Sequence, residues 1–364
     1  MSVPNVALQS GTVPEFTVAG QVQAELARDL ALLSVEEDVH GLTRLQASFI
    51  ATGPRANHPD EQINWLDGQV LDFGKTLRVG MGPSDARRTL FDGKVSALEL
   101  SMEQGRAAEV VCFAEDALMD LRLTRRFKTY ENVSEADLVQ AIASEHGLSA
   151  RADLDSPTWP LVQQWNQSDL AFLRERARRF AAEVWVADGT LHLAARERRE
   201  GESLTLIQGG TLQQVRLCAD LAHQRSKVIA GGFDDADAAA IDEEAGAEAI
   251  AAEAQGHTHG AQVLQRAFGE RTSYRVRDVP LRGDHARAMA RAALLTRARR
   301  FVSVSGVADG NNRLRVGSRL RLERVSALFE GDGYVVTRAR HQFDLLAGYR
   351  TAFEAERAWI GNAA

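Results

Sequence analysis

Two stretches near opposite ends of the chain share one pattern: an apolar residue, glycine, two variable residues, leucine, arginine and another apolar residue. They read FGKTLRV at Phe73–Val79 and VGSRLRL at Val316–Leu322. Each is followed by leucine, phenylalanine, an acid and glycine, at Leu90–Gly93 and Leu328–Gly331. The order and spacing match within loop-sized differences, and another strand pattern follows each copy. We therefore expect an internal duplication, with the two stretches as equivalent strands of two related β-domains.

The repeated pattern also predicts which side chains point inward. Side chains alternate across a strand, so the first, fifth and seventh positions share one face and the arginine lies on the other. The arginines, Arg78 and Arg321, should point toward solvent or a neighbouring subunit, and they are our candidate assembly-interface residues. The residues expected in the cores are Phe73, Leu77 and Val79 in one copy and Val316, Leu320 and Leu322 in the other.

Strand and helix patterns divide the chain into regions. Residues 1–120 read as short alternating strands separated by turn signals, which favours a sandwich or barrel. Residues 121–205 mix both patterns and form an inserted α/β module. Strand patterns resume in residues 206–233 and, with one helix, in residues 261–364, as a second β-domain. The predicted fold class is mainly β with α/β insertions.

Local signals place several elements within these regions. Ser134 with Asp137 predicts the capped start of a helix, and a second helix should begin at Ser168. Asp188-Gly189 lies between two alternating stretches and predicts a two-residue hairpin turn. A longer helix is expected over residues 284–300.

Residues 234–260 are acidic and rich in alanine and glycine. Between Lys227 and Arg266 there are eight acids and no lysine or arginine, in a chain with a formal net charge of −7. We interpret this segment as a mobile insertion without apolar anchors, because it has few large side chains to bury. The rest of the chain is nearly neutral, which argues against a specific nucleic-acid partner.

Histidine and cysteine placement does not indicate a metal site. Cys112 and Cys218 are far apart and each sits in an apolar stretch, so we expect both to be buried and unreactive. His257 and His259 could share one face of a strand, but no cysteine lies nearby and a polar loop explains them better. We predict no metal ligands and no cofactor.

Motifs for nucleotide binding or hydrolysis are absent from the sequence: there is no GxSxG, HExxH or P-loop. Carboxylate pairs such as Glu103 with Glu109, or Asp332 with Glu354, occur in any β-rich protein of this size. We expect no catalytic residues and no enzymatic activity.

Basic clusters lie at Arg122–Lys128, Arg174–Arg179 and Arg297–Arg300. Without interleaved aromatic residues they make poor platforms for single-stranded nucleic acid and suit solvated faces or subunit contacts. The tryptophans of the inserted module are interpreted as core or interface packing: Trp159, Trp165 and Trp185.

Membrane and export signals are also missing. No uncharged stretch approaches the roughly 18–20 apolar residues that span a bilayer, and the first residues lack a basic and apolar leader pattern. We expect the chain to begin in the bacterial cytoplasm and not to insert into a membrane.

Several stretches, in this order along the chain, resemble a known family, the phage late-control D proteins, which are similar to the first half of type VI secretion VgrG proteins. Together the stretches span most of residues 70–360. They are LFDGKVSALELSM, KTYENVSEADLVQAIASEHGL, WNQSDLAFLRERARRFAAEVWVADGTLHL and GYVVTRARHQFDLLAGYRTAFEAER.

This resemblance implies a structural, non-enzymatic baseplate hub. In the family each subunit resembles two tube-like β-barrels with insertions, and a homotrimer presents six barrels to a hexameric tail tube and three-fold symmetry to a spike. The chain ends at Ala364, after the second β region, so the resemblance implies a separate spike protein alongside the tail tube protein and other baseplate proteins. The particle would be a phage virion, a tailocin or a contractile injection system.

Two other functions remain open from the sequence. The chain could be a cell-wall-degrading hydrolase component of the same apparatus, which a catalytic pair in an enclosed cleft would favour. It could instead be a free-standing ligand-binding β protein, which its mass in solution would separate from a hub.

Overall fold

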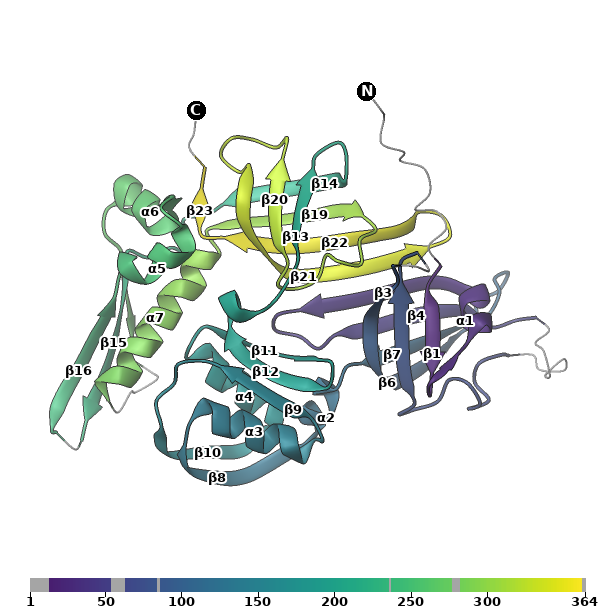
Figure 1. The fold of residues 1–364 in the computed structure, drawn as a ribbon, viewed down its shortest axis with the longest axis horizontal. Coiled ribbons are helices and arrows are strands. Elements are labelled where there is room, and N and C mark those ends of the chain that lie inside the picture. The colour runs from purple at the N-terminus through teal and green to yellow at the C-terminus, as the bar shows by residue number, and fades with distance from the viewer. Residues whose placement is uncertain (1–12, 54–62, 84–85, 236, 277–281, 362–364) are drawn as a thin grey trace. The chain divides into compact units, whose positions relative to one another are not determined.

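The computed structural model describes residues 13–53, 63–83, 86–235, 237–276 and 282–361 (Figure 1). The fold is mainly β with helices in its insertions, which confirms the predicted class. The backbone separates into two compact units, and the four-part division drawn from the sequence stays a prediction. Unit 1 lies within Met1–Met119, Val307–Val316 and Arg338–Phe353, and unit 2 within Asp120–Gly306, Gly317–Thr337 and Glu354–Ala364.

Unit 1 is an antiparallel sheet in the order β21-β3-β4-β7-β6-β5-β1-β2. The closed barrel that the family resemblance implied is not found, because among the described residues the strand order is open and ends at β2. The elements are β1 (Glu15–Val18), β2 (Gln21–Val22), α1 (Ala24–Asp29), β3 (Leu30–Asp38), β4 (Arg44–Ile50), β5 (Thr76–Met81), β6 (Arg88–Ser101), β7 (Glu109–Glu115) and parts of β21 (Gly331–Asp344) and β22 (Gly348–Arg357).

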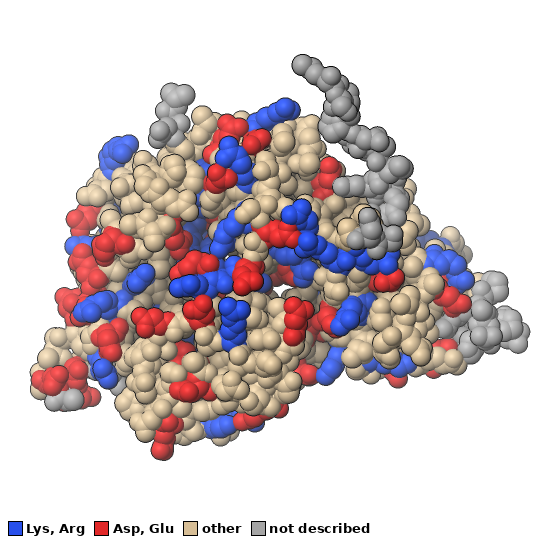
Figure 2. Space-filling view, viewed as in Figure 1, with Lys and Arg blue, Asp and Glu red and all other residues tan. Residues whose placement is uncertain are grey.

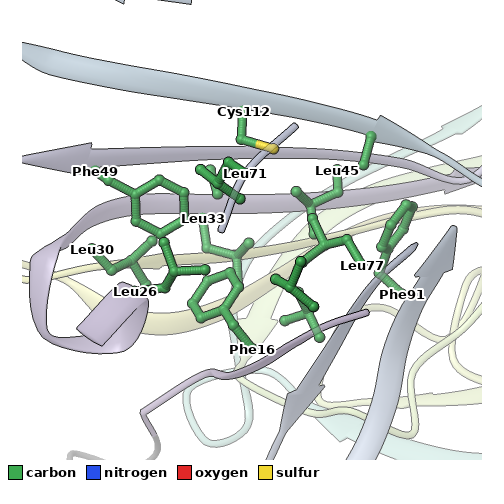
Figure 3. Packing of buried hydrophobic residues seen from close by; sticks show 14 of the residues in the cluster. Phe16, Leu26, Leu30, Leu33, Leu45, Phe49, Leu71, Leu77, Phe91 and Cys112 are labelled. Atoms are coloured by element: carbon green, nitrogen blue, oxygen red, sulfur yellow. The ribbon is translucent and has the colours of Figure 1, made fainter. Parts of the chain in front are cut away.

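The core of unit 1 gathers side chains from strands spread along this sheet. Phe16 on β1 and Phe49 on β4 meet edge to face, with ring centroids 5.4 Å apart. Leu33, Leu77 and Cys112, from β3, β5 and β7, join the same buried cluster (Figure 3). The sheet therefore curls around its own core, as twisted antiparallel sheets do.

The first part of unit 2 mixes helices and strands. Ser134 caps α3 as expected, since its hydroxyl accepts the Asp137 N–H and its own N–H is donated to the Asp137 carboxylate. Asp188 and Gly189 have φ of 47° and 71°, as a tight hairpin turn requires. The elements are α2 (Leu118–Leu123), β8 (Arg125–Val133), α3 (Glu135–Glu145), β9 (Ser149–Asp153), β10 (Trp159–Ser168), α4 (Asp169–Arg178), β11 (Ala182–Ala187), β12 (Thr190–Ala195) and the 3-10 turn η1 (Arg196–Arg198).

The acidic stretch 234–260 is not the unanchored loop that its composition suggested. Ile241 and Ala245 on a strand, and Ile250 and Ala254 on a helix, are buried in one cluster with residues of the long helix α7. Small alanine side chains anchor this segment because they allow the backbones to pack closely. The elements are β15 (Lys227–Asp234), β16 (Ala239–Ala245), α5 (Ala247–Ala254), α6 (Gly260–Phe268), β18 (Thr272–Arg275) and α7 (Gly283–Arg299).

Among the remaining strands, β20 pairs in parallel with β13 and antiparallel with β21. Within the described residues, no helix combines the length and the apolar character needed to cross a lipid bilayer. The strands are β13 (Ser203–Ile207), β14 (Leu212–Ala219), β17 (Thr258–His259), β19 (Val302–Asp309), β20 (Arg319–Glu323) and β23 (Trp359–Ile360).

Candidate assembly surface

Arg78 lies on the outer face of β5 in unit 1. Its neighbours Leu77 and Val79 are buried, so alternation along the strand turns the arginine outward. The side chain is 58% exposed, and its Nη2 lies 2.7 Å from Oδ2 of Asp92. Asp92 is the residue directly opposite Arg78 on β6. The pair therefore crosses the strands at the surface, where it is open to a partner.

Arg321 occupies the corresponding place on β20 in unit 2. Leu320 and Leu322 are buried, and the arginine between them is 46% exposed. Its Nη1 lies 2.8 Å from Oδ2 of Asp332, and its Nε lies 3.0 Å from Oε1 of Glu323. The hydrogen bond to Glu323 and the charge of Asp332 raise the pKa of Arg321. The guanidinium is thus held in place on an exposed surface.

The hairpins β5–β6 and β20–β21 share more than the sequence pattern. In each, a short strand is followed by an antiparallel strand of 14 residues. The register shifts once near the arginine, between Val79 and Gly80 and between Leu320 and Leu322. Each arginine faces the aspartate of an Asp-Gly dipeptide. These common details favour the expected duplication.

One part of the sequence alignment is wrong. Leu90–Gly93 lies in strand β6, whereas Leu328–Glu330 lies before β21, in a turn. The acid that corresponds to Asp92 is therefore Asp332 rather than Glu330. The shared leucine and phenylalanine aligned the two copies two residues out of step, because the turn before β21 holds a similar set of residues.

A close approach of backbone or ring explains the glycine in each Asp-Gly pair. A Cβ on Gly93 would lie 2.2 Å from the carbonyl oxygen of Glu115 on β7. Gly333 has φ +89°, and a Cβ there would lie 2.8 Å from the Trp359 ring. Glycine is needed at both places, although the two obstacles differ.

The expected inward position of Phe73 is wrong. β5 begins only at Thr76, and Gly74 has φ +76°, so strand alternation does not reach back to Phe73. The Phe73 side chain is 66% exposed, whereas its counterpart Val316 is buried.

The histidines and cysteines that the sequence analysis considered as metal ligands or reactive thiols have ordinary structural surroundings. Among the described residues, no three His, Cys, Asp or Glu side chains converge on a possible metal ion. His257 stacks on Trp359, with ring centroids 3.8 Å apart, while His259 is buried and burial lowers its pKa. Burial raises the pKa of Cys112 to about 12. Cys218, expected to be buried, is exposed on β14, because the stretch around it lies mostly at the surface.

Two of the four carboxylates considered above, Glu103 and Asp332, make surface ion pairs. Glu103 lies 3.2 Å from Arg106, with both side chains mostly exposed. Asp332 is the partner of Arg321 and is itself mostly exposed.

Sequence reasoning missed an aromatic surface on β8 and β10. Phe127 and Trp165 are opposite residues of these two strands, and both side chains are exposed. Trp165 is therefore not core, whereas Trp159 packs against Arg176 and His285, and Trp185 stacks on His192. Strand alternation places Phe127 and Tyr130, three residues apart, on opposite faces of β8, and this was the available signal. The bulge after Trp165 weakened it.

The comparisons with known proteins agree with this architecture. Residues 45–344 match the protein family described as the Alg8 N-terminal domain. The chain belongs to this family. No curated protein matches the sequence of this Alg8 N-terminal domain family member.

Solved structures place the fold among tail proteins. The 43 kDa tail protein of prophage MuSo2 from Shewanella oneidensis has 10% identity and a TM-score of 0.71, with 96% of this chain and 99% of that chain covered. A tail protein from Neisseria meningitidis MC58 has 11% identity and a TM-score of 0.66, with 95% and 96% covered.

A third similar structure comes from a secretion apparatus. It is an E. coli component of the type VI secretion system, described as similar to the T4 bacteriophage tail proteins gp27 and gp5. It has 12% identity and a TM-score of 0.56, with 99% of this chain and 78% of that chain covered. The fold of this Alg8 N-terminal domain family member is therefore that of phage tail and type VI secretion tail proteins.

Proposed function

We propose that the chain is a non-enzymatic structural subunit of a baseplate hub, of the late-control D and VgrG type. As a homotrimer it joins a hexameric tail tube to a trimeric spike supplied by a separate protein. It is assembled in the bacterial cytoplasm with other baseplate proteins, and it becomes part of a phage virion or another contractile particle.

The observation that carries this proposal is the pair of equivalent hairpins. A hub with three subunits must offer six similar contacts to a six-fold tube, and a chain with two equivalent surfaces provides two per subunit. The hairpins of β5 and β20 each present an arginine, at Arg78 and Arg321, in similar geometry. Similarity to tail proteins over nearly the full length of both chains supports the same role.

Each arginine then belongs to a surface that contacts the tube. Exposed ion pairs contribute little to folding stability because water and salt screen them. In this proposal the arginines serve recognition. An exposed charge on each half of the subunit attracts a partner of complementary charge and fixes its alignment.

Light scattering coupled to size-exclusion chromatography tests the proposal. We expect a species of three times the chain mass of 39.8 kDa, alone or with the tail tube protein added. A particle that stays monomeric at high concentration, and that does not sediment with assembled tubes, would contradict the hub.

A further inference from the structure

The same strand order occurs twice along the chain. One group of strands is ordered β3-β4-β7-β6-β5, and another is ordered β14-β19-β22-β21-β20. In both groups the first two strands lie side by side and are followed by the last three in reverse chain order. β3 and β14 therefore hold equivalent places, and so do β6 and β21. This equivalence favours the expected duplication and allows the edges of the two groups to be compared.

The outer edge of β21 takes two partners in succession. Its first part pairs with β20 up to Val335, and residues 338–344 pair antiparallel with β3. At this junction the Glu36 carboxylate of β3 accepts hydrogen bonds from Arg338 and Arg340 of β21, at 3.1 and 2.7 Å. The second group therefore binds the first strand of the other group, and an ion pair joins them.

The equivalent part of β6 has no such partner strand. The hydrogen bonds on the β5 side of β6 end at Val95. Among the described residues, no strand pairs with the outer edge of residues 96–101, which we call the β6 edge. Leu98 and Leu100 lie opposite core residues of β7 and so point inward, yet Leu100 is 42% exposed beside this edge. The core of unit 1 is thus uncovered at the β6 edge.

β14 has a free edge that matches this opening. It is the end strand of its sheet, and among the strands that the structure describes it pairs only with β19. Val215 and Leu217 are half-buried, whereas Gln214, Arg216 and Cys218 are exposed. β14 therefore offers an apolar side and a polar side to a further strand. Exposed strand edges pair readily with another chain, and we call this one the β14 edge.

One antiparallel register satisfies both sides of the two edges. If Arg216 lies opposite Glu99, then Val215 and Leu217 lie opposite the two leucines of the β6 edge. The leucines are covered on the core side, and the charges meet on the outer side. Glu99 and Arg216 are exposed, and within the described part of the chain neither has an ion-pair partner. A slip by one residue would exchange the two sides and lose both matches.

Opposite charges already alternate between neighbouring strands on this outer side. The register aligns one row across β21, β3, β4, β7 and β6, which consists of Arg340, Glu36, Arg44, Glu115 and Lys94. Figure 2 likewise shows basic and acidic side chains interspersed over the middle of the face in view. A pair between Glu99 and Arg216 would continue this alternation, because opposite charges on adjacent strands attract each other.

We propose that the β6 edge of one chain pairs antiparallel with the β14 edge of the next chain, and that three such junctions close the homotrimer. The inference rests on the proposed function, which supplies the trimer. Each chain carries one edge of each kind, as a closed ring of head-to-tail contacts requires. A second copy of the chain is the occupant because the chain already forms the equivalent junction internally, between β21 and β3.

An engineered disulfide tests this register. Ala97 would lie opposite Cys218 of the next chain, and both are exposed. Ala97→Cys, oxidised with glutathione disulfide, should therefore give a covalent trimer on a non-reducing gel. Adding Cys218→Ser should abolish that product. Ser101→Cys is the matched control, because it lies four residues, or about 13 Å, further along the strand and should not cross-link.

The outcomes separate this inference from the hub itself. A protein that trimerises while Ala97→Cys fails to cross-link would overturn the edge pairing and leave the hub function standing. Cross-linking by Ser101→Cys instead would overturn the register, and a ladder beyond three chains would contradict ring closure. A wild-type protein that never trimerises would overturn the proposed function, and this inference with it.

A charge exchange gives an independent measurement by analytical ultracentrifugation. Glu99→Arg and Arg216→Glu should each weaken trimer formation by roughly threefold or more, because each brings like charges together. The double variant should recover most of the wild-type affinity, and additive weakening would contradict the ion pair. Glu103→Arg is the matched control, because Glu103 is an exposed acid beyond the end of β6 that lies beside Arg106; it should trimerise normally. Variants that stay trimeric but lose tube or spike binding would assign the edges to those partners and overturn the inference.

Discussion

The hairpin β5–β6 of unit 1 and the hairpin β20–β21 of unit 2 solve the same structural problem with different neighbours. In both, the apolar residues on either side of the arginine are buried, the arginine is exposed, and an Asp-Gly pair lies opposite it. On its other side β5 pairs antiparallel with β1, whereas β20 pairs in parallel with β13. Arg78 has one ion-pair partner among the described pairs, and Arg321 has two.

The comparison separates what the two hairpins share from what differs between them. The shared details lie within the hairpin, including the register shift and the exposed cation. The differences lie in the strands added beside it. Both sets of observations are those that the expected duplication predicts, and each prediction below tests one part of that comparison.

The largest effect is expected from burying a charge in either core. Leu77→Asp and Leu320→Asp should each destabilise the protein by about 3–5 kcal/mol, because both leucines are fully buried. Hydrogen exchange should show the loss in unit 1 for the first variant and in unit 2 for the second. Leu77→Met and Leu320→Met should cost less than about 1.5 kcal/mol. If either aspartate variant lost hydrogen-exchange protection equally in both units, the two hairpins would not support separate cores.

Replacing Gly93 or Gly333 with alanine should lower the free energy of unfolding by different amounts. Gly93→Ala and Gly333→Ala should each cost about 1–3 kcal/mol, with Gly93→Ala the more costly, because its new Cβ meets backbone rather than a side chain. Chemical denaturation measures both. Gly105→Ala is the control for a positive φ alone, since Gly105 has φ +84° and open space around it. A cost for Gly333→Ala no greater than for Gly105→Ala would argue against the close approach to the Trp359 ring.

Acid should distinguish the units through His341, which lies in unit 1. Burial lowers the pKa of His341 to about 3, below its ordinary value of 6.5. The unfolded state then binds the proton first, so stability falls as pH drops below about 6.5, by up to about 1.4 kcal/mol per pH unit. Urea midpoints between pH 7 and 4 should show this loss, and His341→Gln should reduce the slope. An unchanged slope in the variant would remove His341 as the cause.

The smallest effect on folding should come from the arginines. Arg78→Glu and Arg321→Glu should leave the denaturation midpoint nearly unchanged, because both side chains are exposed and screened. Both should weaken assembly with the tube. Arg321→Glu should perturb its own hairpin more, since it faces Glu323 and Asp332 at once. Normal tube binding by both variants would separate the arginines from the interface.

Sequence patterns predicted elements whose signals are local. The Ser134 cap, the turn at Asp188-Gly189 and the helix expected over residues 284–300 are confirmed, because a few neighbouring residues determine each of them. The mainly β class followed from short alternating stretches.

Features that depend on packing were missed. The stretch 234–260 looked too polar to fold, yet alanines and two isoleucines pack against α7, which composition alone does not reveal. Phe73 was placed inside because the strand was assumed to start three residues early. The aromatic surface on β8 and β10 escaped notice because only strand pairing brings Phe127 and Trp165 side by side. The candidate arginines were found by alternation, but their ion pairs needed the fold.

The central claim is that two equivalent hairpins in each of three copies meet a six-fold tube. Native mass spectrometry of the chain bound to the tail tube protein of the same particle tests it most directly, by counting subunits at the junction. The account predicts three copies of this chain on a ring of six tube subunits. A complex with six copies of this chain on six tube subunits would contradict it, because each copy would then supply only one contact.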